Sequence, residues 1–377
     1  DKDSVLQDYL DSMYMISHSH STVSSYKLAI TNMHKSGFRN FIEQKYNIDE
    51  IQFAEKIKAG EFDVYKILKE WLVFLDKFGY RPKSIESRLA IVKGYLRHLG
   101  LKIYSEDSKQ YLRLPKNVRQ REEPLTKAMI LRILRHLPLK LQTVVLVLTA
   151  SGMRIGELVQ LKLSDIDFAT NPTTIKLRGE TTKTRQSRET FLTSEARDAL
   201  KDYLKRYFEW VEGQQNLHLK DTMIFGRTSI VKSEKYIEKK TKVPQHLLVS
   251  SLLMKTLSYY LEKSPELAEK NRNGRRIVHF HALRKFFRTT VGNVCGRDYA
   301  EALIGHSFYM DTYYNLPSDE RLKLYLKAEP YLTISDYSKV DKTLQDLTEK
   351  YRELEKKYDE FKRYAPMNNI PVPNSNV

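Results

Sequence analysis

The 377-residue chain is basic: 64 Lys and Arg against 47 Asp and Glu give a formal net charge of +17, which favours a polyanionic partner, most commonly nucleic acid. No apolar run approaches the ~20 residues that cross a bilayer, and no signal peptide is seen, so we expect a cytoplasmic protein. The single cysteine, Cys295, excludes an intramolecular disulfide and a Cys-rich zinc site, and the length allows two or three domains.

Residues 1–104 are predicted to form a small bundle of four or five short helices. Apolar residues recur at helical spacing over 5–17, and a Ser- and Thr-rich joint at 17–25 is predicted to cap the next helix, over 25–37. Two further helices, over 63–79 and 84–100, each end at a glycine. The last one carries basic residues that form either a solvated face or phosphate contacts: Lys83, Arg88, Lys93 and Arg97.

Residues 105–124 are predicted to be a basic linker, because they are polar, contain two prolines and lack periodicity. Their basic side chains either follow a nucleic-acid backbone or are simply solvated. The candidates for backbone contact are Arg113, Lys116, Arg119 and Arg121.

Residues 125–335 are predicted to form a larger domain with a small sheet. The pattern over 165–193 switches to alternation every two residues, with polar turns, which indicates two or three short antiparallel strands. Helices are expected on both sides of this region, over 125–138, 140–152, 154–162, 194–213, 250–263 and 281–294. The expected fold class is therefore mostly α with a small antiparallel sheet, or α+β.

Residues 336–364 carry a heptad pattern with charged flanks. The apolar positions are spaced 4-3-4-3-4-3 and are Val340, Leu344, Leu347, Tyr351, Leu354, Tyr358 and Phe361. This spacing predicts a coiled coil, or a helix docked on a neighbour, and leaves open whether the pairing is within or between protomers. The tail at 365–377 is expected to be disordered.

Polar side chains of the larger domain form the set that attack on a phosphodiester by a hydroxyl group requires. Arginines neutralise the non-bridging oxygens of the transition state, a histidine handles the nucleophile's proton, a lysine protonates the leaving oxygen, and a tyrosine is the nucleophile. No metal or other cofactor is needed, since the cations are side chains. The candidates are Arg154, Lys183, His281, Arg284, His306 and a tyrosine of the Tyr313–Tyr314 pair, with Glu157 orienting a neighbouring cation.

More ordinary interpretations exist for these residues one at a time. Arg154 could cap the preceding helix, Glu157 could be a surface charge, and His279 with His281 could be half of a metal site. Lys183 shares its hairpin with other basic residues, and the strand register decides which side chain points inward. The alternatives in the hairpin are Lys176, Arg178, Arg185 and Arg188.

In their order, the motifs ASGMRIGEL, a lysine in a strand turn, HALR, LIGHS and a downstream tyrosine resemble the tyrosine recombinase, or phage integrase, family over roughly 123–335. The closing YLKAEPYLTI resembles archaeal members of that family. The resemblance implies a DNA core-binding domain at 1–104, a catalytic domain at 125–335, a C-shaped clamp on double-stranded DNA, a 3′-phosphotyrosyl intermediate and a synaptic tetramer of this chain.

The resemblance also implies a role for each candidate. Arg154 and Arg284 become the transition-state cations, Lys183 the general acid and His281 the proton-handling histidine. His306 becomes a hydrogen-bond donor to the phosphate, and Glu157 a support behind the arginines.

The nucleophile is the least certain of these residues, because Tyr313 and Tyr314 follow His306 by only seven and eight residues. Both spacings are shorter than is usual in the family. Ser318 is expected to cap the next helix, and the family nucleophile commonly stands four residues before such a cap, which favours Tyr314 over Tyr313.

The expected function is site-specific DNA recombination or integration, as in mobile genetic elements. Three alternatives remain at this point: a type IB-like topoisomerase, a non-catalytic DNA-binding protein on the same scaffold, and a basic helical regulator that reads the major groove with its helices.

Overall fold

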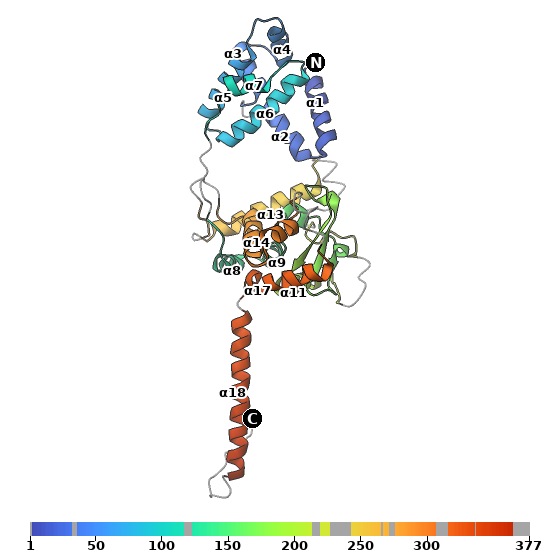
Figure 1. Ribbon diagram of the computed structural model, residues 1–377, viewed down its shortest axis with the longest axis vertical. Coiled ribbons are helices and arrows are strands. Elements are labelled where there is room, and N and C mark those ends of the chain that lie inside the picture. The colour runs from blue at the N-terminus through green and yellow to red at the C-terminus, as the bar shows by residue number, and fades with distance from the viewer. Residues whose placement is uncertain are drawn as a thin grey trace. The chain divides into compact units, whose positions relative to one another are not determined.

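The computed structural model describes residues 2–31, 36–116, 123–212, 219–226, 243–264, 267–270, 276–306, 316–335 and 337–364, and side chains of the last segment from 347 to 362. The chain forms two compact units, Asp1–Arg121 and Glu122–Val377 (Figure 1). Four sequence predictions fall outside the described residues: the Tyr313–Tyr314 pair, the linker arginines Arg119 and Arg121, and the disordered tail.

The described part of residues 1–104 contains six helices, where the sequence predicts four or five, and a seventh follows within the N-terminal unit. Their caps are local: the Asp49 side chain accepts hydrogen bonds from two amides of α4, and Asp63 caps α5 in the same way. The helices are α1 (Lys2–Ser17), α2 (His20–Ile30), α3 (Phe38–Tyr46), α4 (Glu50–Lys58), α5 (Val64–Lys77), α6 (Pro82–His98) and α7 (Ser105–Tyr111).

Two expected boundaries in this unit are wrong. Helix α2 begins at His20 rather than at residue 25, because the Ser19 side chain caps it from within the Ser-rich joint. The segment expected to be a linker begins with α7. The Tyr65 hydroxyl attaches α7 to α5 by donating to the Asp107 carboxylate at 3.2 Å and accepting from the Tyr104 amide at 3.0 Å.

The core of the N-terminal unit is aromatic and encloses one buried ion pair. Trp71 is fully buried and meets Phe38 edge to face, with ring centroids 5.4 Å apart. The Arg39 guanidinium donates to the buried Glu50 carboxylate at 2.7 Å, and the Tyr95 hydroxyl donates to the same carboxylate at 3.2 Å. The ion pair thereby connects α3, α4 and α6.

The C-terminal unit combines helices with a small sheet, as the sequence predicts. Its helices are α8 (Lys127–His136), α9 (Leu139–Ser151), α10 (Ile155–Leu158), α11 (Ser194–Phe208), α13 (Gln245–Glu262), α14 (Phe280–Cys295), α15 (Arg297–Ile304), α17 (Ser318–Leu332) and α18 (Tyr337–Tyr364). Two short 3₁₀ turns flank the first strands, η1 (Leu163–Asp165) and η2 (Gly179–Thr181).

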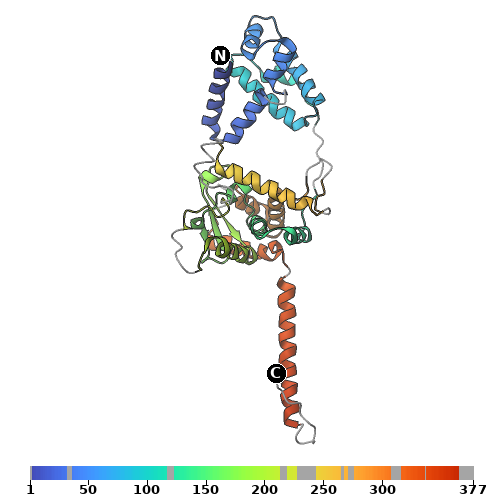
Figure 2. The ribbon, with the colours of Figure 1, turned by 180° about the vertical axis from the view of Figure 1, so that it is seen from behind.

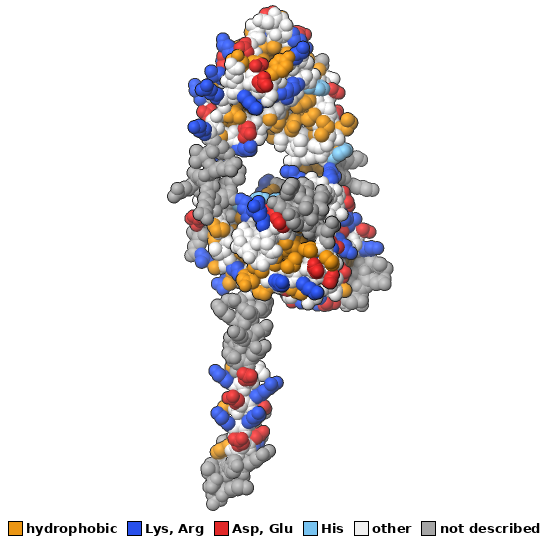
Figure 3. Space-filling view, viewed as in Figure 1, with side chains coloured by type: hydrophobic (Ala, Val, Ile, Leu, Met, Phe, Trp, Pro, Cys, Tyr) orange, Lys and Arg blue, Asp and Glu red, His pale blue; other side chains and the backbone are white. Residues whose placement is uncertain are grey.

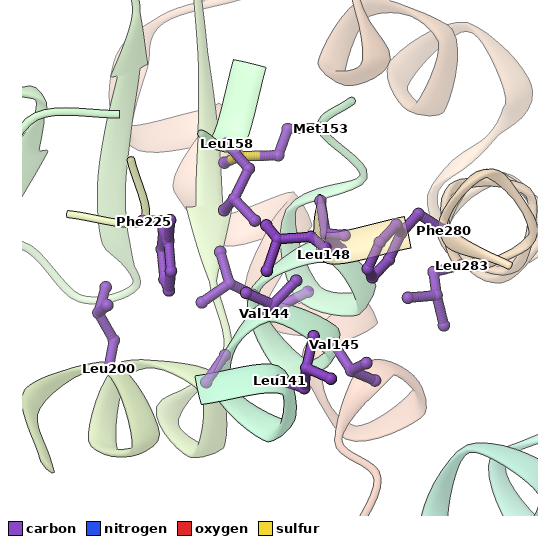
Figure 4. Close-up of a cluster of buried hydrophobic side chains, with 14 of the residues drawn as sticks. Leu141, Val144, Val145, Leu148, Met153, Leu158, Leu200, Phe225, Phe280 and Leu283 are labelled. Atoms are coloured by element: carbon purple, nitrogen blue, oxygen red, sulfur yellow. The ribbon is translucent and has the colours of Figure 1, made fainter. Parts of the chain in front are cut away.

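Helix α9 lies at the centre of this unit, because its sequence is apolar on nearly every side. Val144, Val145 and Leu148 are buried (Figure 4). Helices α11 and α14 pack against α9 and contribute Leu200 and Leu283 to the same core. The expected buried helix at 140–152 is therefore confirmed, and its C-terminal end points to the region of the candidate residues.

The three strands are β1 (Ile166–Asp167), β2 (Thr173–Leu177) and β3 (Arg188–Leu192), paired antiparallel in the order β1-β2-β3 (green in Figure 2). The register sets Leu177 opposite Arg188 and Ile175 opposite Thr190. Because side chains alternate along a strand, Arg188 and Thr190 share one face of β3. Both are buried.

The helix expected over 154–162 is only one turn long. After α10 the backbone tightens, with the amide of Gln160 bonded to the carbonyl of Glu157. Lys162 then pairs with Met223 in an isolated β-bridge. Extended pairing at Lys162 is incompatible with a continued helix, so the helix ends.

Helix α18 is one continuous helix of 28 residues over the segment with the heptad pattern (Figure 1). Within the described ranges, none of the helices combines the length and the apolar character that spanning a membrane requires.

Candidate active site

The C-terminal end of α9 fastens three other elements together. The last carbonyls of a helix have no partner within the helix, and here the carbonyls of residues 150–152 each accept a side-chain hydrogen bond. The donors are Tyr325 of α17 at 2.8 Å, Thr190 of β3 at 2.7 Å and Arg284 of α14 at 2.6 Å. Residues far apart in the chain therefore meet at one point.

Gly152 makes this meeting possible. It ends α9 in the left-handed conformation, with φ +63°. A Cβ atom on Gly152 would lie only 2.2 Å from the Phe287 ring, so only glycine lets α14 approach this closely. The chain then reverses into Arg154, the residue immediately before α10.

Glu157 organises the arginines around it. Its carboxylate accepts hydrogen bonds from the Arg154 amide at 2.7 Å and the Arg154 guanidinium at 3.0 Å. It also accepts two from the Arg188 guanidinium, at 3.1 and 2.6 Å. Burial opposes ionisation, but the charge and hydrogen bonds of Arg188, followed by those of Arg154, lower the pKa of Glu157 below its ordinary value.

Arg284 is buried beside this cluster. Its guanidinium donates to the carbonyls of Gly152 and Ile304, at 2.6 and 2.5 Å. Burial, followed by the positive charge of Arg154, lowers its pKa to about 9, so the side chain is still protonated at neutral pH. Arg154 and Arg188 thus bind one carboxylate, and the charges of Arg154 and Glu157 both act on Arg284, so positive charge is in surplus here and suits an anion.

A second buried carboxylate, Glu301 of α15, binds His306 and Arg288. The His306 ring contacts it through Nδ1, and the Arg288 Nε donates at 2.5 Å. Burial opposes ionisation, but the hydrogen bond and charge of Arg288, followed by the charge of His306, lower the pKa of Glu301. Glu301 therefore fixes the orientation of the His306 ring.

Both candidate histidines have lowered pKa values. Partial burial lowers the pKa of His281, and the charges of Lys285 and Arg284 lower it further. Burial also lowers the pKa of His306, against the opposing effect of Glu301. Both imidazoles are therefore neutral at pH 7 in the protein alone.

The structure brings some of the predicted residues together and leaves others apart. Arg154, Glu157, Arg284, His281 and His306 form one neighbourhood, since the charges of Arg154 and Arg284 act on both histidines. Lys183 is exposed in the turn between β2 and β3 and makes no hydrogen bond to any described residue. Figure 3 shows basic and histidine side chains gathered beside an acidic one on this unit.

The strand register answers which basic residue of the hairpin points inward: it is Arg188. Its Nε also donates to the Leu303 carbonyl at 3.0 Å. Arg178 binds Asp165 at 3.1 Å instead, while Lys176 and Arg185 are exposed.

The expected cap at Ser318 is wrong by one residue. Pro317 is the N-cap of α17 and its carbonyl accepts from the Arg321 amide at 3.1 Å, whereas the Ser318 side chain makes no capping bond. Counting four residues back from Pro317 reaches Tyr313. The cap therefore no longer favours Tyr314, and only the longer spacing from His306 does.

The basic residues predicted on α6 do not share one face. At ~100° per residue, Lys83, Lys93 and Arg97 lie within about 80° of one another, and Arg88 lies on another side. Arg88 stacks on Tyr80, 4.3 Å from the ring centre, and Arg97 donates to the Ile103 carbonyl at 3.0 Å. Lys83 pairs with Glu86 at 2.8 Å, and beyond α7, Arg113 and Lys116 are exposed.

Sequence reasoning missed two contributors, Glu301 and Gly305, and named Arg188 only as one alternative to Lys183 in the hairpin. Gly305 has φ +72°, and a Cβ there would lie 2.8 Å from the Arg188 side chain. A signal was present, since Gly305 stands directly before His306. No local pattern marks Glu301, because its partners are contributed by the fold.

The part of the chain that the structure describes holds no group of three or more His, Cys, Asp or Glu side chains suited to a metal ion. The Nδ1 of His279 instead lies 3.0 Å from the Arg276 carbonyl.

Comparison with known proteins identifies relatives of this unit. The model of the phage integrase family matches residues 121–315. Two proteins named tyrosine recombinase XerA, from the archaea Thermococcus kodakarensis and Thermococcus onnurineus, are 30% and 31% identical over 113 residues. Those residues are 29% of this chain and 38% of each relative, so the match spans well under half of the length of either relative.

The fold is also that of a solved recombinase. The crystal structure of a lambda integrase dimer bound to a COC′ core site matches with a TM-score of 0.52 at 17% identity, over 84% of this chain and 98% of the other.

Proposed function

Because this chain belongs to the phage integrase family of tyrosine recombinases, we propose that it is a site-specific recombinase that cleaves and rejoins double-stranded DNA. The observation that carries the proposal is the convergence of Arg154, Arg284 and His281 beside the buried Glu157. Three arginines near one carboxylate offer the surplus positive charge that a phosphodiester in its transition state requires. The net charge of +17 fits a DNA substrate.

The proposed reaction is a transesterification at one phosphate. The hydroxyl of Tyr314, or of Tyr313 as the alternative, attacks the phosphorus, and the bond from phosphorus to the 5′ oxygen breaks. The products are a 3′-phosphotyrosyl link and a free 5′ hydroxyl. The step is reversed when the 5′ hydroxyl of another strand attacks the phosphorus of this link and releases the tyrosine hydroxyl. Arg154 and Arg284 stabilise the charge on the non-bridging oxygens, so the reaction needs no metal ion.

The protonation state of each side chain determines its part in proton transfer. His281 is neutral at pH 7 because its pKa is lowered, so it can accept the proton of the tyrosine hydroxyl. Lys183 would donate a proton to the leaving 5′ oxygen from its place in the hairpin turn. His306 becomes a donor to the phosphate only when protonated at both nitrogens, and a bound phosphate, being anionic, favours that form.

Around this chemistry we propose a clamp on DNA and a synaptic tetramer. The N-terminal unit would serve as the core-binding domain, with Lys83, Lys93 and the segment after α7 contacting phosphates. Arg88 and Arg97 have structural partners in this unit, so their contribution to DNA binding is expected to be smaller. With DNA as its substrate, the protein is proposed to be cytoplasmic and associated with DNA.

A nicked suicide DNA substrate tests the enzyme. The protein is expected to form an adduct that survives denaturation, and formation should continue in EDTA. Absence of an adduct on any cognate DNA contradicts the proposal, and loss in EDTA contradicts a mechanism without metal. Relaxation of supercoiled plasmid without sequence preference indicates a topoisomerase instead.

Two matched variants identify the nucleophile. Tyr314→Phe is expected to abolish the adduct, and Tyr313→Phe to retain it. The opposite result assigns the role to Tyr313, as the cap of α17 at Pro317 favours.

A further inference from the structure

Helix α18 presents an apolar stripe to solvent over its described part. The exposed fractions are 63% for Leu347, 66% for Tyr351, 67% for Leu354, 38% for Tyr358 and 40% for Phe361. Their spacing averages 3.5 residues, so they stay on one side of the helix. No described residue of the chain covers this stripe, and the helix lies beyond residues 121–315, which the family model matches. The recombinase chemistry does not account for it.

We propose that α18 pairs with α18 of a second copy of this chain as a coiled coil. The pattern meets the requirements of such a pair: apolar residues at positions a and d over about three heptads, with charges at several of the flanking positions e and g. In this assignment Leu347, Leu354 and Phe361 are at d, and Tyr351 and Tyr358 are at a. Helices in proteins gain most of their stability from packing of an amphipathic face, and over its described part the 28-residue α18 leaves that face exposed.

The charge balance of α18 indicates which partner covers its apolar stripe. From 337 to 364 the sequence contains eight Lys and Arg and seven Asp and Glu, a net charge of +1, against +17 for the whole chain. A helix that binds DNA is expected to be strongly basic, and one that binds the basic remainder of this chain is expected to be acidic. A nearly neutral helix does not strongly repel a second copy of itself, and Figure 3 shows charges of both signs along α18.

The flanking charges also make the pairing testable by charge reversal. Lys350 is at position g. In a parallel pair it faces Glu355 of the second copy, because g contacts the following e. In an antiparallel pair g faces g, and Lys350 meets Lys357. Reversing the charge at residue 350 must therefore change self-association in either orientation.

The test is the oligomeric state of the full chain without DNA, measured by sedimentation velocity over a range of concentrations. The wild type is expected to dimerise or assemble further reversibly, and Leu354→Glu to weaken self-association more than tenfold, which corresponds to more than about 1.4 kcal/mol. A wild type that stays monomeric, or a Leu354→Glu variant that associates as tightly as the wild type, overturns the proposal.

The matched variants Lys350→Glu and Lys356→Glu distinguish a contact between the paired helices from a general effect of net charge. Both make the same charge change, but residue 356 is at position f, away from the partner. Lys350→Glu is expected to weaken association several-fold in a parallel pair and strengthen it in an antiparallel pair, while Lys356→Glu leaves it unchanged. Equal effects of the two variants contradict a coiled coil of α18.

The fold and the proposed chemistry provide an independent control. Because residue 354 is exposed and outside the candidate active site, Leu354→Glu is expected to keep the circular dichroism of the wild type and to form the covalent adduct on a single suicide half-site. Loss of helical signal beyond that of α18 itself shows that the stripe covers another part of the same chain, and contradicts the proposal.

Discussion

Each unit of this protein buries a glutamate–arginine pair, and the two pairs differ in the partners around them. In the N-terminal unit, the side chains of Glu50 and Arg39 are 0% and 9% exposed. In the C-terminal unit, those of Glu157 and Arg188 are 2% and 1% exposed. The first pair ties helices together, with the Tyr95 hydroxyl as a further donor to Glu50.

The second pair has an additional cation at the surface, whereas the additional surface partner of the first pair is a carboxylate, Asp3. Glu157 also binds Arg154, whose side chain is 28% exposed. One carboxylate thus neutralises a buried arginine and orients an accessible one. The comparison teaches that burial of an ion pair does not reveal its purpose. We propose that the accessible second cation, Arg154, marks the pair that serves the reaction.

The largest effect is expected from removing the shared carboxylate. Glu157→Ala leaves Arg188 buried without a counter-ion, which costs about 3–5 kcal/mol. Urea unfolding of the full chain, followed by a probe in the C-terminal unit, measures the loss. Glu50→Ala is the counterpart and should destabilise the N-terminal unit through Arg39. A loss below about 1 kcal/mol for Glu157→Ala shows that Arg188 finds other compensation.

Arg154→Ala is expected to separate chemistry from stability. Removing one preorganised donor typically slows a reaction by about 10²–10³-fold, so adduct formation should fall by that factor. Stability should change by less than about 1 kcal/mol, because Arg154 is partly exposed and Glu157 retains Arg188. Single-turnover kinetics and thermal unfolding measure the two effects. Arg39→Ala should show the reverse, and an Arg154 variant that mainly unfolds contradicts the comparison.

Gly305→Ala tests how tightly Arg188 is held. The substitution strains a backbone at φ +72° and places a Cβ 2.8 Å from Arg188, so a loss of about 1–3 kcal/mol is expected. Gly296→Ala is the matched control, because Gly296 has φ +92° with nothing within 4 Å. Thermal unfolding should show a larger loss for Gly305→Ala. Equal losses mean that Arg188 moves aside without cost.

The smallest effect concerns pH. The lowered pKa of His281 keeps the imidazole neutral below its ordinary pKa of 6.5, so adduct formation should persist as the pH falls through that value and decline only in more acidic solution. Lys285→Gln removes one cause of the lowering, and the decline should move to higher pH. Lys255→Gln, on α13, serves as the control. A decline that starts above pH 6.5 in the wild type contradicts this role of His281.

Much of the fold follows from local patterns. The apolar run of α9, the alternation around the sheet and the heptads of α18 each reflect a period that neighbouring residues express by themselves. Two helix starts differ from the sequence prediction for local reasons. Ser19 began α2 early, and Pro317 replaced Ser318 as the cap of α17.

For the site, the sequence alone predicts the chemical groups: Arg154, Glu157, Arg284, His281 and His306 stand in recognisable motifs. It does not predict which groups meet. Arg188 points inward because of the strand register, and Glu301 holds His306 because a short helix returns the chain to Arg288. The joining contact, from Arg284 to the Gly152 carbonyl, spans 132 residues. Such a contact depends on satisfying the open carbonyls of α9, a requirement that arises only when the tertiary structure forms.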